Sequence, residues 1–383
     1  MGTIQAAFFI IGTSIGAGFI SGAELVRFFH TEHFFLPVIL SVAFFFAMTL
    51  LFLRLGRKYG GYKNTLRALF GRGASAVYTI VILVSFIPCA GMLAGLDALV
   101  PSISPVPSLL GLIIVLLFLK KGMKGISVLN SILVPILLLF VFFARGQSAL
   151  GFSFPIKLTA VAGGALYAGM NVFLAAPVLM DAGKDMKRLA PSAFLAAAVI
   201  AASAICVLSK VYGMGHAAIE AELPFLYVMR GRRSFYIAAA LAILTSLASS
   251  LYPLLGMCDS FGAKSKNAAK GVVILAAFGL SRLGLGGIVG VFYPLIGCGG
   301  IFLSCVCFLY DQLLEKNHEE VHSRRKQTKN KRRGHHKVKL KHLPAVDDKV
   351  SEPRLGNDIL AHNRADPRHT YAHLQHGYKG GTR

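Results

Sequence analysis

Long apolar stretches separated by short polar segments are the dominant pattern along this chain. A stretch of about 20 apolar residues can cross the hydrocarbon core of a bilayer as a helix. Ten stretches approach this length and predict helical spans at residues 4–27, 34–53, 74–97, 106–119, 125–144, 158–180, 189–210, 234–257, 269–282 and 284–310. The fourth and ninth are short, and only a few glycines separate the last two. The pattern therefore predicts an all-α membrane protein with ten transmembrane helices.

The composition agrees with a membrane domain that is followed by a different kind of segment. Of the 383 residues, 55% are hydrophobic and 15% are charged, whereas a soluble domain has about 45 to 50% apolar and about 25% charged residues. A water-soluble globule is thereby excluded. We assign residues 1–310 to the transmembrane domain and residues 311–383 to a basic, His-rich, disordered cytoplasmic tail.

The tail is expected to act through its charge. Residues 324–341 contain ten Lys and Arg side chains, and basic segments next to a membrane are drawn to anionic lipid headgroups. Neither metal binding by the tail histidines nor nucleic-acid binding has support beyond this composition, so no nucleic-acid partner is expected.

The basic residues between the spans predict the orientation. With the N-terminus inside, the inner loops hold fifteen Lys and Arg residues and the outer loops hold eight, and cytoplasmic loops are the ones that carry an excess of positive charge. An even number of spans returns the tail to the same side. The first residues, MGTIQ, lack the positive charge of a signal peptide. We expect both termini to be cytoplasmic.

The first span is rich in glycine, with Gly12, Gly16, Gly18 and Gly22 inside FFIIGTSIGAGFISGAELVRFF. Each glycine costs about 1 kcal/mol relative to alanine in a helix interior, so the helix is weakest at residues 16–18. A break there would free backbone groups at membrane depth, which is tolerated where they line a cavity or bind a ligand. Small residues four apart can equally form a close-packing face. This span alone supports both interpretations.

The sixth span, five spans later, is interrupted in the same way by Gly163, Gly164, Gly169 and Pro177. Interrupted segments at corresponding positions of two halves indicate an inverted-repeat secondary transporter whose site lies between discontinuous helices. We therefore predict breaks near residues 16–18 and 168–171. Asn171 adds an amide at membrane depth, where an unpartnered polar group is costly; an interhelical hydrogen bond is its structural alternative.

The eighth span carries a group of hydroxyls, namely Thr245, Ser246, Ser249 and Ser250. Residues 242, 245, 246 and 249 share one face of a helix. Such hydroxyls commonly bond only their own backbone, so their presence alone is weak evidence. Oxygen ligands without a carboxylate nevertheless suit a weakly held monovalent cation such as Na⁺, coordinated together with freed carbonyls.

Together, these segments resemble the amino acid–polyamine–organocation superfamily, whose members have the LeuT-type five-plus-five inverted repeat with discontinuous helices 1 and 6. GAGFISGAE, at residues 16–24, and LYAGMN, at residues 166–171, are most similar to the YkvI-like bacterial membrane proteins. The resemblance covers about residues 1–310. It implies a secondary transporter in the bacterial plasma membrane. An enzyme is not expected, because no phosphate-binding loop, zinc motif or nucleophile elbow is found in a plausible context.

The resemblance also implies an ion site. In sodium-coupled members the eighth helix carries an Ala-x-x-Thr-Ser unit and a later Pro, as Ala242, Thr245, Ser246 and Pro253 do here. By resemblance, one Na⁺ would be held by the side chains of Thr245 and Ser246 and by the carbonyls of Gly12, Ile15 and Ala242. Members with a second sodium have Asn directly after the glycine pair. Phe19 stands there in this chain, which argues against a second ion. No other cofactor is expected.

The predicted substrate is a small polar solute, an amino acid or an amine, bound by Gly16, Ala17, Gly18, Phe19, Tyr167 and Asn171. A helix N-terminus after Gly18 could hold a carboxylate. Glu24 lies six residues beyond Gly18, about 9 Å along a helix, and is expected to line the outer vestibule; recognising an amine and carrying a proton are its alternatives.

Two further functions remain open from the sequence. A receptor of the same fold could sense a ligand without carrying it, and a proton-coupled exporter would differ in driving ion and direction. Asp97, Asp181 and Asp259 stand at span ends, where capping or solvated roles are expected.

Removing residues 324–383 should leave ligand binding and solute exchange by the membrane domain unchanged, because the tail cannot reach a site at the bilayer midplane. Binding and counterflow by purified full-length and truncated protein in liposomes would measure this. A well-folded truncated protein that binds no solute would contradict the division into two parts.

Overall fold

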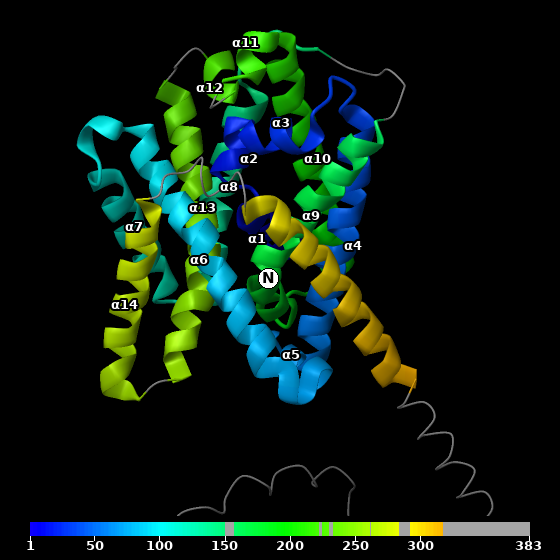
Figure 1. The fold of residues 1–383 in the computed structure, drawn as a ribbon, viewed down its shortest axis with the longest axis vertical. Coiled ribbons are helices and arrows are strands. Elements are labelled where there is room, and N and C mark those ends of the chain that lie inside the picture. Colours follow the sequence, from blue (N-terminus) through cyan, green and yellow to red (C-terminus); the bar gives the residue numbers. More distant parts are fainter. Residues whose placement is uncertain (150–156, 222–223, 230–232, 261, 283–291, 317–383) are drawn as a thin grey trace, which may run out of the picture. The chain divides into compact units, whose positions relative to one another are not determined.

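The computed structural model describes residues 1–149, 157–221, 224–229, 233–260, 262–282 and 292–316, and all regular secondary structure within them is helical (Figure 1). The helices are α1 (Thr3–Ser14), α2 (Ala17–Ser21), α3 (Ala23–Phe29), α4 (Phe35–Tyr59), α5 (Tyr62–Phe70), α6 (Ala74–Leu99), α7 (Val106–Leu119), α8 (Met123–Phe142), α9 (Leu158–Gly183), α10 (Leu189–Gly213), α11 (His216–Ile219), α12 (Pro224–Val228), α13 (Arg233–Met257) and α14 (Ala263–Ser281), with short 3₁₀ turns at Gly71–Gly73, Pro101–Ile103 and Cys258–Ser260. A further helix, Phe292–Lys316, follows α14.

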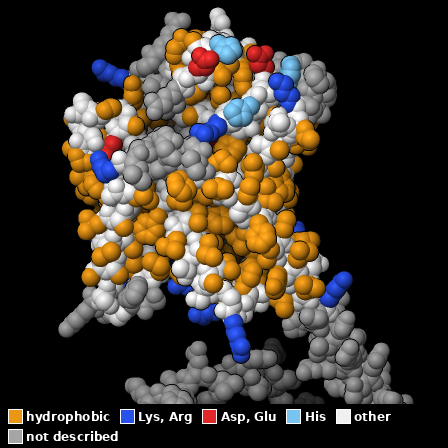
Figure 2. All heavy atoms as spheres, viewed as in Figure 1, with side chains coloured by type: hydrophobic (Ala, Val, Ile, Leu, Met, Phe, Trp, Pro, Cys, Tyr) orange, Lys and Arg blue, Asp and Glu red, His pale blue; other side chains and the backbone are white. Residues whose placement is uncertain are grey.

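A helix covers the main part of every predicted span. Among the described residues, seven helices are long and apolar enough to cross a membrane, while α1 and α7 are shorter apolar helices. Figure 2 shows hydrophobic side chains over the middle of the visible face and charged side chains toward its two ends. The chain is therefore an all-helical, multi-pass membrane protein. The count of ten crossings stays a prediction.

Several chain segments meet at one end of the bundle. The amino group of Met1 donates to the carbonyl of Asp185, which follows α9, at 2.9 Å. Lys58, in the last turn of α4, pairs with Asp311 at 2.6 Å and with Glu315 at 2.7 Å. Arg57, next to Lys58 in α4, donates to the carbonyl of Gly183 at the end of α9 at 3.4 Å. The N-terminus, the loop after α9 and the end of the last helix therefore share one side, as the loop assignment requires. Which side faces the cytoplasm stays a prediction.

Acidic residues at two span ends have the capping role that the sequence suggests. Asp181 accepts the N–H of Tyr62, the first residue of α5, at 2.8 Å. Asp97 accepts the N–H of Ser108 at 3.0 Å, in the first turn of α7, and pairs with Arg282 at 3.0 Å. Helix N-termini have N–H groups without partners in the helix, so these carboxylates join separate helices of the bundle.

The third acidic residue, Asp259, lies between α13 and α14. It pairs with Lys266 at 2.8 Å and with Lys270 at 3.0 Å. Burial raises the pKa of Asp259, but the hydrogen bonds and charges of the two lysines outweigh burial and lower this pKa below its ordinary value.

The first span is discontinuous, as the sequence predicts. Helix α1 ends at Ser14, Ile15 and Gly16 are extended, and α2 begins at Ala17. A second bend follows at Gly22, which has φ 78° and separates α2 from α3. Figure 1 shows α3 lying across the long helices near one end of the bundle.

The break predicted at residues 168–171 is wrong. Helix α9 is continuous from Leu158 to Gly183, and Pro177 lies inside it. Its glycines serve close approach instead: a methyl group on Gly163 would overlap the carbonyl of Phe28, and one on Gly183 would overlap the carbonyl of Leu53. The glycines of the sixth span therefore form a packing face, the alternative that the sequence analysis raised for the first span.

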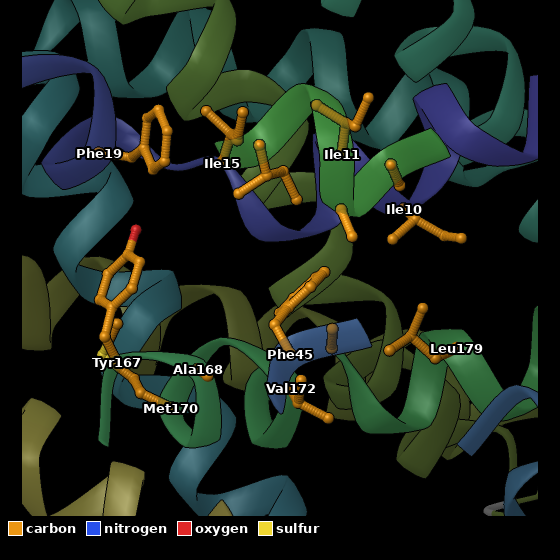
Figure 3. Packing of buried hydrophobic residues seen from close by; sticks show 14 of the residues in the cluster. Ile10, Ile11, Ile15, Phe19, Phe45, Tyr167, Ala168, Met170, Val172 and Leu179 are labelled. Atoms are coloured by element: carbon orange, nitrogen blue, oxygen red, sulfur yellow. The ribbon is translucent and has the colours of Figure 1, made fainter. Parts of the chain in front are cut away.

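The core between α1 and α9 is made of large and small apolar side chains. Figure 3 shows Ile10 and Ile11 of α1, and Ile15 directly after it, on the side that faces α9. The α9 side chains opposite them include Val172 and Leu179. All five are fully or almost fully buried. Close packing of this kind fixes the position of the α1 end against the middle of the bundle.

Replacing Gly183 by Ala should lower the free energy of unfolding by about 1 to 3 kcal/mol, the usual cost of overpacking, because the methyl group would overlap the backbone of α4. Gly279→Ala is the matched control, since nothing lies within 4 Å of its added methyl group and alanine favours a helix. Unfolding in SDS, followed by circular dichroism, would compare them. Equal stability of the two variants would contradict the packing role.

Candidate functional site

The break in the first span lies directly against α13. Ile15 has φ −91° and ψ 106°, and Gly16 has φ −104° and ψ −173°. The last carbonyls of a helix have no partner within the helix. Beyond the end of α1, the carbonyl of Ile15 accepts a hydrogen bond from Ser246 Oγ of α13 at 2.9 Å. This contact joins residues 231 positions apart in the sequence.

Of the five residues predicted to bind sodium, four form two hydrogen-bonded pairs, and Gly12 has a different neighbour. Ser246 contacts the carbonyl of Ile15, and Thr245 Oγ1 donates to the carbonyl of Ala242 at 2.8 Å. Thr245 and Ala242 are fully buried. The α-carbon of Gly12 faces a different neighbour, since a methyl group there would lie 2.5 Å from Asn130 Cγ of α8. Ser246 and Ile15 thus meet at the break, whereas Thr245 bonds within its own helix; the common site and ion binding stay predictions.

A small polar cavity of about 30 Å³ lies beside the break. It has room for one or two groups of the size of water, which is far less than the 300 Å³ or more of common ligand pockets. The space beside the break is therefore too small for a whole solute. The described lining residues are Thr13, Ser14, Gly16, Glu24, Pro88, Met92, Met170, Asn171, Leu174, Ser246, Ser249, Ser250 and Tyr293.

Only part of the predicted substrate-binding set lines this cavity. Gly16 and Asn171 do so, and Asn171 Nδ2 donates to the carbonyl of Tyr167 at 2.9 Å. The cavity thus receives an amide from α9 even though that helix is unbroken. The side chain of Ala17 lies outside the described part of the structure.

The two predicted aromatic contacts, Phe19 and Tyr167, are buried and are not among the residues that line this cavity. Tyr167 packs against Phe28 and Phe29 of α3, with ring centroids 5.3 and 6.1 Å away. Phe19 is 1% exposed and belongs to the apolar core. Figure 3 shows the Tyr167 hydroxyl pointing from α9 toward the segment that carries Phe19.

The vestibule position expected for Glu24 is wrong. Glu24 is 4% exposed and lines the cavity. The left-handed conformation of Gly22 ends α2 after five residues, so the chain turns instead of continuing as one helix. The carboxylate then folds back onto Gly18, where a methyl group would overlap Glu24 Oε1.

Several lining residues escaped the sequence analysis. Ser14 ends α1, and its hydroxyl is buried without a hydrogen-bond partner. Tyr293 reaches the cavity from the helix Phe292–Lys316, and Pro88 reaches it from the middle of α6. A tyrosine or proline inside an otherwise apolar span was the available signal in both cases.

A larger, apolar groove of about 370 Å³ lies between α6 and the last helix. Ile87 and Phe292 line this groove, while their sequence neighbours Pro88 and Tyr293 line the polar cavity. The same two helices, α6 and Phe292–Lys316, therefore border both spaces.

Comparison with known sequences gives two relatives from Bacillus subtilis (strain 168). The membrane protein YkvI is 23% identical over 317 residues, which cover 76% of this chain and 91% of YkvI. The protein YyaD is 23% identical over 329 residues, which cover 80% of this chain and 96% of YyaD. Both are described as uncharacterized. No family model matches the chain.

Two solved transporter structures share the arrangement of helices. Mhp1, a nucleobase-cation-symport-1 family transporter in a closed conformation with bromovinylhydantoin bound, has a TM-score of 0.55 at 14% identity and covers 77% of this chain and 74% of its own. A Na⁺-coupled sialic acid symporter in a substrate-bound outward-open state has a TM-score of 0.56 at 16% identity. The match covers 81% of this chain and 78% of the symporter. The chain has the LeuT-type transporter fold.

The similarity to YkvI and the LeuT-type fold confirm the resemblance to YkvI-like membrane proteins; the five-plus-five inverted repeat stays a prediction. The structural neighbours are transporters and not enzymes, in agreement with the sequence expectation. Because these identities are low, the comparisons establish the fold and neither the solute nor the coupling ion.

Gly22→Ala should destabilise the protein by about 1 to 2 kcal/mol, the cost of a left-handed conformation in a residue with a side chain. A methyl group there meets its neighbours at ordinary contact distances of 3.4 Å, so crowding adds little. Gly22→Asn is the control, because asparagine tolerates this conformation better. Thermal unfolding followed by circular dichroism would rank wild type, Asn and Ala in that order; an Ala variant as stable as wild type would contradict the turn's role.

Proposed function

We propose that the protein is a secondary active transporter of a small polar solute, coupled to one sodium ion held between the end of α1 and α13. The observation that supports this most is the hydrogen bond from Ser246 to the free carbonyl of Ile15 at the break. Broken helices of transporters use such carbonyls to coordinate coupling ions.

The chemistry of the predicted ligands favours a monovalent ion. They comprise two hydroxyls, Thr245 and Ser246, and the carbonyls of Gly12, Ile15 and Ala242. Neutral oxygens can replace the hydration shell of Na⁺, whereas divalent ions prefer sites with carboxylates. In this structure the hydroxyls donate to carbonyls of the same set; an ion would replace those bonds with ion–oxygen contacts.

Ion binding at this position would couple two parts of the molecule. The break belongs to α1, and the hydroxyls belong to α13, so a bound ion would favour conformations that hold these two segments together. A ligand shifts a conformational equilibrium by its difference in affinity for the two states. The Na⁺-coupled sialic acid symporter provides a precedent for sodium coupling in this fold.

The proposal places the chain in the bacterial plasma membrane with both termini in the cytoplasm and the basic tail near anionic lipid. Uptake and counterflow in proteoliposomes, with sodium and pH gradients imposed separately, test transport itself. Binding without counterflow would favour the ligand-sensing receptor, and a dependence on the pH gradient alone would favour the proton-coupled exporter.

Sodium should stabilise the purified protein relative to potassium or choline at equal ionic strength and fixed pH, by about 1.4 kcal/mol at ten times the dissociation constant. Removing both hydroxyls, in Thr245→Ala with Ser246→Ala, should abolish this difference. Melting temperatures in each salt would measure it without knowledge of the solute.

Ser85→Ala is the matched control, because Ser85 is buried and bonds only the carbonyl of Val81 in its own helix. It should keep the sodium response. An equal response of the double variant and the wild type would exclude the sodium site.

A further inference from the structure

The polar cavity contains the carboxyl group of Glu24, which has no positive partner among the described residues. Glu24 is 4% exposed, and none of the ion pairs in the described part of the chain includes it. The described lining residues include no Lys, Arg or His. A buried carboxylate without a positive partner is strongly unfavourable.

The position of this carboxylate changes which ligand can bind. A solute carboxylate was expected after Gly18, at the start of α2. Glu24 Oε1 now lies against the α-carbon of Gly18, in space that a methyl group would take. Helix α2 has only five residues, so its dipole is too short to offset two negative groups. A solute carboxylate would therefore meet the protein's own carboxylate.

The remaining polar groups suit a cation that donates hydrogen bonds. Asn171 Nδ2 is used by the carbonyl of Tyr167, which leaves Oδ1 as an acceptor. The hydroxyl of Ser14 has no partner in the structure, and those of Ser249 and Tyr293 reach the same cavity. An ammonium group has three donors and no acceptor, so it can pair with Glu24 and use neighbouring oxygens.

From this juxtaposition we infer that the solute is an organic amine without a carboxylate, bound through its ammonium group to Glu24. The inference rests on the proposed transport function and names the solute class of the same site. Gly18 leaves space for the carboxylate, and the turn at Gly22 aims it into the cavity. The cavity of about 30 Å³ accommodates little more than the charged head, so a longer amine requires the helices around it to move.

Matched pairs that differ by one carboxylate provide the test: methylamine and glycine, isobutylamine and valine, tyramine and tyrosine. Binding to the full-length protein in nanodiscs and counterflow in proteoliposomes would be measured for each member. Wild type should bind the amine of at least one pair ten or more times as tightly as its amino acid. Charge-assisted pairing makes a difference of this size reasonable.

Three variants identify the group responsible. Glu24→Gln keeps the shape and removes the charge, and it should weaken amine binding at least tenfold. Gly18→Ala should weaken it as well, because the methyl group displaces the carboxylate. Glu32→Gln removes a carboxylate from an exposed position and should change nothing. The sodium response of Glu24→Gln should stay that of wild type.

The outcomes separate this inference from the transport proposal. Amino acids that bind as well as their amines, or no binding by any pair, would overturn the amine assignment. Counterflow of amino acids alone would also overturn it while leaving transport intact, and amine binding without counterflow would support it and refute transport. Loss of the sodium response in Glu24→Gln with unchanged amine binding would make Glu24 an ion ligand and overturn the inference.

Discussion

The requirement that backbone polar groups find partners inside a membrane governs this structure. No water is available in the hydrocarbon region to satisfy a freed N–H or carbonyl, so a helix can end there only beside other polar groups. Helix α1 ends at Ser14, and the next carbonyl, that of Ile15, receives Ser246 from α13. The polar cavity, the hydroxyl cluster and the buried glutamate all lie around this one interruption.

Hydropathy predicted the helices well because a membrane span depends mainly on its own length and polarity. The glycine patterns were harder to interpret. Gly16 and Gly163 look alike in the sequence, yet Gly16 lies in an extended break, whereas Gly163 lies in an intact helix against the backbone of Phe28. The deciding fact is what packs against the α-carbon, which a single sequence does not contain.

Glu24 illustrates the same limit at the site. Its distance from Gly18 was estimated along a straight helix, and the turn at Gly22 made that estimate wrong. A glycine at this position permitted the turn without requiring it. Thr245 and Ser246 lie side by side on α13 as expected, because a local spacing on one helix survives folding, and Ser246 reaches the break; their role in ion binding stays a prediction. Tyr293 was missed, since its role depends on a helix that comes more than 100 residues after α9 and packs beside it.

The charges in the two proposals have an energetic consequence. Sodium would bind neutral oxygens near Ser246, while a solute ammonium would be balanced by Glu24. If Glu24 keeps its negative charge and its place in the membrane through the cycle, each inward step moves two positive charges across the membrane, one on sodium and one on the amine. The membrane potential acts on each elementary charge with about 2.3 kcal/mol per 100 mV, so it would drive such a cycle twice as strongly as one that moves sodium with a neutral solute.

An unpaired carboxylate would also hinder the return of the transporter without a bound solute, because burying that charge without a positive partner is unfavourable. The same residue would thus select the solute and limit leakage of sodium in its absence.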